Sequence, residues 1–226
     1  MAKTDALPPS TQYNSNYGNF QKTLYAEIRR EAFGEDIGQN SWITASELDG
    51  FARRLELQPG KTLLDIACGA GGPALRVAAT TGCSVVGIDR HEQAIDTARA
   101  LAEERKLSGR ATFRAGDASA RLPFADASFD AVLCIDAINH FPDRPRLLSE
   151  WVRVLKPGGR LLFTDPITVT GPLTNAEIAA RSAGGFYLFV PHGYDEGLLG
   201  ECGLRLMACE DVTANMAGIA AARHLA

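Results

Sequence analysis

The stretch Leu63-Leu64-Asp65-Ile66-Ala67-Cys68-Gly69-Ala70-Gly71-Gly72 decides the fold of this chain. Its first half is an apolar run with the length of a buried strand, and its second half is a glycine-rich turn. Pro73 follows, and proline is well suited to a first helical turn. The stretch therefore predicts a strand, a tight turn in which the backbone passes close to a ligand, and a helix.

Strands alternate with helices after this first unit. Following the strand at 62–67, apolar runs predict strands at 84–88, 111–115, 131–135 and 160–164, with helical patterns between them. This alternation is typical of an α/β protein with a Rossmann-like, doubly wound, mostly parallel sheet and helices on both faces. Such sheets bind their ligands beyond the carboxyl ends of the strands.

The flanking segments complete the predicted domain organisation. Residues 1–58 are interpreted as an N-terminal arm and a helical lid. Residues 59–226 form the predicted ligand-binding domain, with a substrate-facing insertion at about 167–203. A sixth strand is predicted at 205–212, before a helical pattern that runs to the last residue.

The composition argues against several classes of protein. The 226 residues include 23 basic and 27 acidic side chains, which gives a formal net charge of −4. Such a chain lacks the basic face that a phosphate backbone requires, so we expect no nucleic-acid partner. No apolar run reaches the ~20 residues that a membrane-spanning helix needs, and the start does not read as a signal peptide. The five cysteines form no C-x-x-C pair, which predicts reduced thiols, a cytoplasmic protein and no metal site.

Asp65 separates two interpretations of the glycine turn. Gly69-x-Gly71-x-x-Ala74 fits the dinucleotide fingerprint, which favours a nicotinamide-dependent oxidoreductase. However, a carboxylate inside an apolar strand is costly unless it is paired, and it would repel the pyrophosphate of a dinucleotide. S-adenosylmethionine brings an ammonium and a sulfonium group to the same loop, so electrostatics favours this cofactor.

Two further acids lie at predicted strand ends. Asp89 ends the second strand, where a carboxylate can accept hydrogen bonds from ribose hydroxyls, and this feature is common to both interpretations. Asp117 follows the third strand and can accept a hydrogen bond from an adenine amino group. The third acid therefore favours the adenosyl cofactor further.

Several motifs now resemble one family, the class I S-adenosylmethionine-dependent methyltransferases of the small-molecule type. The matches run in order from about residue 61 to 165, and together they are highly specific. The motifs that carry the resemblance are Leu64-Asp65-Ile66-Ala67-Cys68-Gly69-Ala70-Gly71, Val86-Gly87-Ile88-Asp89, Ala115-Gly116-Asp117-Ala118, Leu122-Pro123-Phe124, Phe129-Asp130-Ala131-Val132 and Leu155-Lys156-Pro157-Gly158-Gly159-Arg160-Leu161.

The resemblance implies S-adenosyl-L-methionine as the cofactor, S-adenosyl-L-homocysteine as the product and a role for each matching residue. Asp65 and the loop residues Ala67, Gly69 and Gly71 would serve the methionine part of the cofactor. Asp89 would bind the ribose. The adenine would be contacted by Arg90, Asp117, Ala118 and the backbone of Ile135.

The acceptor side offers one candidate for proton transfer. His140 follows the fourth strand, on the face where the methyl group should point, and a His can take a proton near neutral pH. Its alternative role is a cap or packing residue, because proximity alone can support methyl transfer. Further candidates for acceptor binding are Tyr17, Asp136, Asp165, Phe186 and His192.

Trp42 also has two interpretations. It lies in the polar segment 38–42 before the predicted second helix, as lid segments do in similar small-molecule methyltransferases. Its indole face could attract the sulfonium of the cofactor. Alternatively, the side chain packs as a core residue that anchors the second helix.

One departure from the family concerns the end of the sheet. Class I methyltransferases usually end with a sixth and a seventh strand, whereas the seventh is apparently missing here. An uncovered sheet edge invites pairing with another chain, so a monomer or a homodimer is expected. The predicted function is methyl transfer to a nitrogen, an oxygen or a carbon of a small-molecule acceptor. The alternatives are the oxidoreductase and an inactive module that binds an adenosyl ligand.

Overall fold

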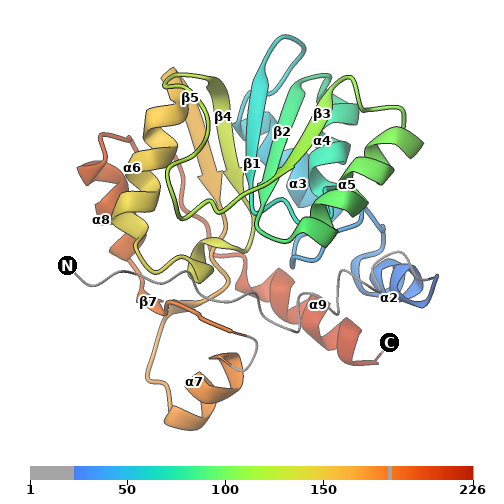
Figure 1. The fold of residues 1–226 in the computed structure, drawn as a ribbon. Helices are drawn as coiled ribbons and strands as arrows, with labels where there is room; N and C mark the ends of the chain where they lie inside the picture. The colour runs from blue at the N-terminus through green and yellow to red at the C-terminus, as the bar shows by residue number, and fades with distance from the viewer. Residues whose placement is uncertain (1–22, 183–184, 226) are drawn as a thin grey trace.

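The computed structural model describes residues 23–182 and 185–225 of the chain. Its centre is a five-stranded, all-parallel sheet with the order β3-β2-β1-β4-β5 (Figure 1). The strands are β1 (Thr62–Ile66), β2 (Ser84–Asp89), β3 (Ala111–Ala115), β4 (Phe129–Cys134) and β5 (Leu155–Phe163). The predicted parallel α/β fold is therefore confirmed.

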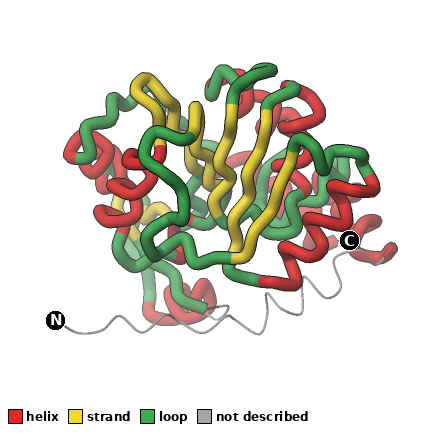
Figure 2. Tube along the Cα trace, turned by 45° about the horizontal axis from the view of Figure 1, so that its top comes forward, coloured by secondary structure: helices red, strands yellow, loops and turns green. Residues whose placement is uncertain are grey.

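Helices cover both faces of this sheet, and the strand residues alternate between two cores (Figure 2). Leu63 packs on one side with α3 (Ala45–Arg54), α4 (Gly72–Thr81) and α5 (Glu92–Glu104). The next residue, Leu64, packs on the other side, in the second core, with α6 (Arg144–Val154) and α8 (Tyr194–Glu201). This alternation follows from the two-residue period of a strand. It buries Leu63 and Leu64 completely.

The strand register brings the functional loops to one edge. Ile66 pairs with Ile88 of β2 and with Cys134 of β4, and Asp89 pairs with Ala115 of β3. Because the strands are parallel, the loops that follow them emerge side by side. In Figure 1 this edge points downward, toward α7 and α9.

The predicted capping box at the start of α3 is present. The Thr44 hydroxyl accepts a hydrogen bond from the backbone N–H of Glu47, and the Glu47 carboxylate accepts one from the N–H of Thr44 at 2.8 Å. Leu48, Ala52 and Leu55 then pack into the core on the Leu63 side of the sheet. The second half of the predicted N-terminal lid is thus part of the helical cover of the sheet.

The two ends of the described chain meet near the strand ends. Helix α2 (Thr23–Phe33) packs against α9 (Thr213–Leu225) through Ala32, Phe33 and Ile219. The sequence predicts a helical pattern at this end of the chain, but it does not predict which part of the fold the helix packs against. No described helix is long and apolar enough to cross a membrane.

The insertion after β5 adds a small two-stranded sheet and two helices to the fold. It contains β6 (Thr168–Val169), α7 (Asn175–Ser182), β7 (Val190–Pro191) and α8, and β6 pairs with β7 in parallel. Helix α7 has no buried residue.

The sixth strand predicted at 205–212 is wrong, because these residues form no strand. A strand needs a hydrogen-bonded neighbour, and β5 remains the last strand of the sheet within the described residues. Leu206, Met207 and Val212 are exposed, at 46%, 69% and 46%. The predicted strand therefore has neither a paired neighbour nor a covering layer among the described residues.

Candidate active site

The glycine turn after β1 is built from left-handed backbone. Ala67, Gly69 and Gly71 have positive φ angles of 56°, 53° and 77°. At Gly71 a β-carbon would lie 2.8 Å from the β-carbon of Ala98, so a larger residue cannot fit without displacing α5. The turn leads directly into α4, whose first backbone N–H groups face the edge of the sheet where ligands bind.

Asp65 is a buried carboxyl group with no hydrogen-bond partner among the described residues. Its side chain lies within β1, and the residue is only 3% exposed. Burial, and secondarily the charge of Asp89, raises the pKa of Asp65 to about 8. An unpaired acid at this position fits the ammonium group of S-adenosylmethionine and does not fit a pyrophosphate.

Asp89 connects the glycine turn to the end of β2. One carboxylate oxygen accepts a hydrogen bond from the N–H of Gly69 at 2.9 Å. The other accepts one from the N–H of His91 at 2.9 Å and lies 3.0 Å from its Nδ1. A carboxylate oxygen offers about two acceptor positions, so the oxygen bonded to Gly69 retains one for a ribose hydroxyl.

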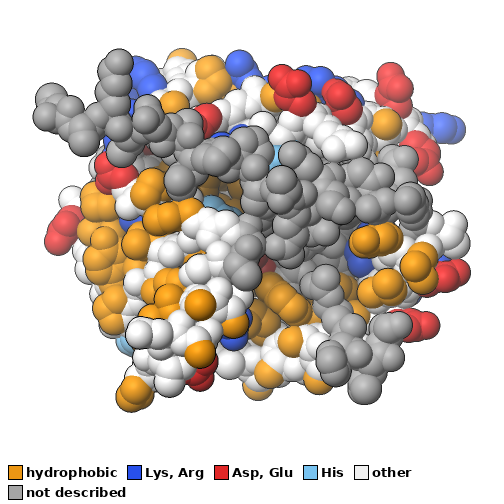
Figure 3. All heavy atoms as spheres, turned by 60° about the horizontal axis from the view of Figure 1, so that its bottom comes forward, with side chains coloured by type: hydrophobic (Ala, Val, Ile, Leu, Met, Phe, Trp, Pro, Cys, Tyr) orange, Lys and Arg blue, Asp and Glu red, His pale blue; other side chains and the backbone are white. Residues whose placement is uncertain are grey.

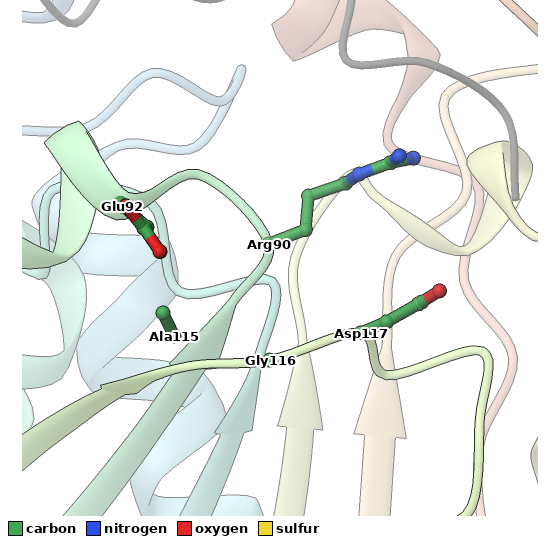
Figure 4. A pocket seen from close by; sticks show the side chains of 5 residues that line it. All are labelled: Arg90, Glu92, Ala115, Gly116 and Asp117. Atoms are coloured by element: carbon green, nitrogen blue, oxygen red, sulfur yellow. The ribbon is translucent and has the colours of Figure 1, made fainter.

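A pocket of about 350 Å³ opens next to the ends of β2 and β3, and it is lined by Arg90, Glu92, Ala115, Gly116 and Asp117 (Figure 4). Arg90 and Asp117 extend to the same side of it, whereas Glu92 lies toward Ala115. Gly116 packs closely on the sheet, because a β-carbon there would lie 2.9 Å from Cδ1 of Ile88. The predicted adenine contacts Arg90 and Asp117 thus come together.

Other residues complete the description of this pocket. Ala118 is buried next to Asp117, whose carboxylate accepts hydrogen bonds from the N–H and hydroxyl of Ser119 at 2.9 and 2.6 Å. Ile135 follows β4 and packs against the core that contains Leu63. Glu92 was missed by the sequence analysis. The one feature that could have indicated Glu92 is its position in the first turn of α5, a helix that begins just after the strand β2.

The segment before α3 lies directly on the glycine turn. A β-carbon on Gly72 would lie 2.2 Å from the carbonyl oxygen of Gly38 and 2.3 Å from that of Ile37. The backbone N–H of Trp42 donates to Asp136 at 2.6 Å. The segment 37–42 is therefore positioned as a cover over the first turn of α4.

The two interpretations of Trp42 differ in where the indole lies. Its ring packs against the cluster of Ala32, Phe33 and Ile219, between α2 and α9. This placement favours the packing role over a contact with the sulfonium. Asp136 links the segment 37–42 to the end of β5. One of its carboxylate oxygens accepts from the N–H of Trp42, and the other accepts from the Thr164 hydroxyl at 2.5 Å.

His140 ends a short 3-10 helix (Ile138–His140) that follows β4. Its Nδ1 lies 3.0 Å from the backbone carbonyl oxygen of Phe186, and its ring centroid lies 4.7 Å from that of Tyr187. Burial of the ring lowers the pKa of His140 below its usual value. The imidazole is therefore neutral near pH 7 and able to accept a proton.

Asp165 lies in a buried ion cluster that the sequence analysis missed. Arg144 is fully buried and donates to Asp165 at 2.6 Å and to both oxygens of Asp195 at 2.7 and 2.6 Å. Asp165 also accepts a hydrogen bond from the N–H of Ile167. The Arg144 guanidinium of α6 thus links Asp165, after β5, to Asp195 on α8. No sequence pattern pointed to this cluster, because Arg144-Pro145 is typical of a helix start.

The other residues predicted to bind the acceptor do not form one cluster among the described residues. The His192 side chain is 76% exposed and lies 3.8 Å from Glu196. Phe186 is 37% exposed and meets the site through its backbone carbonyl. Tyr17 lies outside the described residues.

Comparisons with known proteins agree with this geometry. A family model described as a methyltransferase domain matches residues 64–163. The 27-O-demethylrifamycin SV methyltransferase of Amycolatopsis mediterranei is 32% identical over 201 residues, which cover 84% of this chain and 74% of that protein. This chain belongs to the class I S-adenosylmethionine-dependent methyltransferases. The cofactor of this methyltransferase is S-adenosylmethionine, as predicted.

Two solved structures share the fold, and one of them is a methyltransferase. The phosphoethanolamine N-methyltransferase 2 of Haemonchus contortus, in complex with S-adenosyl-L-methionine, is 26% identical with a TM-score of 0.74. The match covers 92% of this methyltransferase but only 49% of that chain. The [4+2]-cyclase SpnF is 25% identical with a TM-score of 0.70, and the match covers 98% of this methyltransferase and 85% of that chain.

Proposed function

We propose that this methyltransferase transfers the methyl group of S-adenosylmethionine to a hydroxyl oxygen of a bulky, largely apolar small molecule. The observation that carries the choice of oxygen is the half-buried His140 in the 3-10 helix after β4, whose pKa burial lowers. A hydroxyl must lose its proton during methylation, and a neutral imidazole can accept it. The name of the relative from Amycolatopsis mediterranei agrees, since it specifies methylation at an oxygen.

The roles proposed for the cofactor side follow the geometry of the strand ends. Asp65 receives the ammonium group, Asp89 binds the ribose, and Asp117 with Arg90 borders the adenine. When bound, S-adenosylmethionine supplies a methyl group activated by its sulfonium sulfur. The protein contributes orientation and a dry site, which are the main requirements of a direct displacement.

The proposed acceptor surface lies on the insertion after β5. Four large apolar side chains of the insertion are exposed, at 37–43%. Figure 3 looks toward the carboxyl ends of the strands and shows apolar side chains gathered on this face. The four residues are Leu173, Ile178, Phe186 and Tyr194.

Calorimetry tests the cofactor part of the proposal. Wild-type protein and Asp65→Asn would be titrated with S-adenosylmethionine and S-adenosylhomocysteine, with Asp96→Asn as the control because Asp96 is exposed on α5. We expect wild type and Asp96→Asn to bind both ligands and Asp65→Asn to lose at least tenfold in affinity. Equal binding by Asp65→Asn would remove Asp65 from the cofactor site.

A labelled-methyl assay tests the acceptor part. The protein would be incubated with methyl-labelled S-adenosylmethionine and with polycyclic alcohols or amines of matched size. We expect label on the alcohols, and label on amines alone would contradict the choice of oxygen. If S-adenosylmethionine binds but is never consumed with any acceptor, methyl transfer is not the activity of this protein, and the proposal is wrong.

A further inference from the structure

We propose that residues 186–188 of the insertion are positioning residues that hold His140 as the Nδ1–H tautomer, so that Nε2 is the atom that takes the acceptor's proton. The inference rests on the proposed function, because it names the atom through which His140 would act. The insertion would then both contact the acceptor and position the imidazole of His140.

Three consecutive residues of the insertion contact the turn that carries His140. The backbone carbonyl of Phe186 lies 3.0 Å from Nδ1, Tyr187 lies against the imidazole ring, and the N–H of Leu188 donates to the carbonyl of Asn139 at 2.7 Å. A 3-10 helix of three residues has little stability of its own. The position of His140 therefore depends on this segment.

The tautomer follows from the chemistry of the carbonyl. A carbonyl oxygen only accepts hydrogen bonds, so Nδ1 must carry the proton that lies between them. In a neutral imidazole the other nitrogen, Nε2, then has the lone pair. A side-chain hydroxyl in place of the carbonyl would permit either tautomer, whereas the backbone carbonyl permits one.

Burial, more than the surrounding charges, keeps the His140 ring neutral. Burial has the largest effect on the pKa of His140 and lowers it, the bond to Phe186 and the charge of Asp165 raise it, and His91 and Arg90 lower it. Asp165 is paired with Arg144 at 2.6 Å, which limits its influence. Tyr187 contributes to the burial, because its ring covers the imidazole.

During methyl transfer the proton of the acceptor hydroxyl moves to Nε2 of His140. The O–H bond of the acceptor breaks, its proton moves to Nε2, and the oxygen uses the freed electron pair to bond the methyl carbon, whose former bonding pair stays on sulfur. The imidazolium keeps its Nδ1–H on the carbonyl of Phe186, and a hydrogen bond from a charged donor is stronger than one from a neutral donor. The segment 186–188 therefore stabilises the charged ring as well as the neutral one.

Nitrogen NMR of protein labelled at its four histidines tests the tautomer without an acceptor. His140→Gln identifies the His140 signals by their loss. At about pH 8 we expect Nδ1 to show the shift of a protonated nitrogen and Nε2 that of an unprotonated one. The opposite pattern would overturn the inference even if the protein methylates alcohols.

Two variants at Tyr187 test the positioning role. Tyr187→Ala admits water to the ring, so the His140 titration and the acidic limb of the kcat profile should both move to higher pH. Tyr187→Phe keeps the ring contact and should restore the wild-type titration. An unchanged His140 titration in Tyr187→Ala would contradict the role of Tyr187, whereas loss of methylation with the tautomer intact would contradict only the proposed function.

Discussion

At the scale of single residues, the buried carboxyl of Asp65 is expected to bind the cofactor, but its ionised form destabilises the free protein. Its carboxyl is buried, has no hydrogen-bond partner in the described part of the chain, and has a pKa raised from 3.8 to about 8. The folded protein without its cofactor therefore binds a proton that the unfolded chain releases. A ligand cation would remove this conflict, which explains why an acid is placed inside an apolar strand.

The first prediction concerns the stability of the protein without its cofactor. Because the folded-state pKa of Asp65 is raised, the free energy of unfolding should fall as the pH rises from about 4 to 8. The full difference is on the order of 5 kcal/mol. Asp65→Asn should be more stable than wild type near pH 8 and should lose this part of the pH dependence.

Urea unfolding at several pH values between about 4 and 8 measures this effect. Asp96→Asn serves as the control, because its side chain is 75% exposed. A wild-type stability that rises with pH across the same window, with Asp65→Asn parallel to it, would show that Asp65 is ionised and solvated in the free protein.

At the scale of elements, the segment 37–42 and the first turn of α4 form one unit. The carbonyl oxygens of Ile37 and Gly38 lie where a β-carbon of residue 72 would be, and Asp136 holds the far end of the segment through the N–H of Trp42. The close approach covers the loop expected to hold the methionine part of the cofactor. Displacing the segment should therefore affect binding before it affects folding.

Gly72→Ala tests this unit. The added β-carbon would overlap two backbone oxygens at 2.2–2.3 Å, and backbone cannot rotate away as a side chain can. We expect cofactor affinity to fall at least tenfold while the sheet stays folded by circular dichroism. Gly50→Ala in α3 is the matched control, since only Arg53 lies near its β-carbon at 3.8 Å. Unchanged affinity in Gly72→Ala would mean that the segment is not a cover.

At the scale of the whole molecule, the buried ion cluster joins the sheet to the insertion. Arg144 comes from α6, Asp165 follows β5 and Asp195 lies on α8. Burial of such charges is costly, so their mutual pairing is essential. The cluster fixes the position from which the insertion reaches His140.

Arg144→Met tests the cluster. Removing the guanidinium leaves two buried carboxylates unpaired and should destabilise the protein by about 3–5 kcal/mol. The loss should be smaller near pH 5 than near pH 8, because the carboxyls can take up protons at lower pH. Arg146→Met, which removes an exposed arginine from the same helix, is the control in urea unfolding. Equal losses at both pH values would contradict the electrostatic explanation.

Much of the fold was predictable because it is local. The strands, the glycine turn and the capping box at Thr44 each depend on neighbouring residues, through side-chain period, backbone conformation and hydrogen bonds over three residues. The wrong sixth strand at 205–212 shows the limit of this reasoning. A local sequence pattern can suggest a strand, but a strand exists only if a distant segment pairs with it.

The sequence by itself determined the α/β sheet, the acids at its strand ends and the class of cofactor, because period and charge belong to the residues themselves. Only the tertiary structure decided which polar groups meet. It paired Asp165 with Arg144, placed Trp42 between α2 and α9, and brought the carbonyl of Phe186 to His140. These contacts join residues far apart in the chain, and packing of the two cores sets their distances.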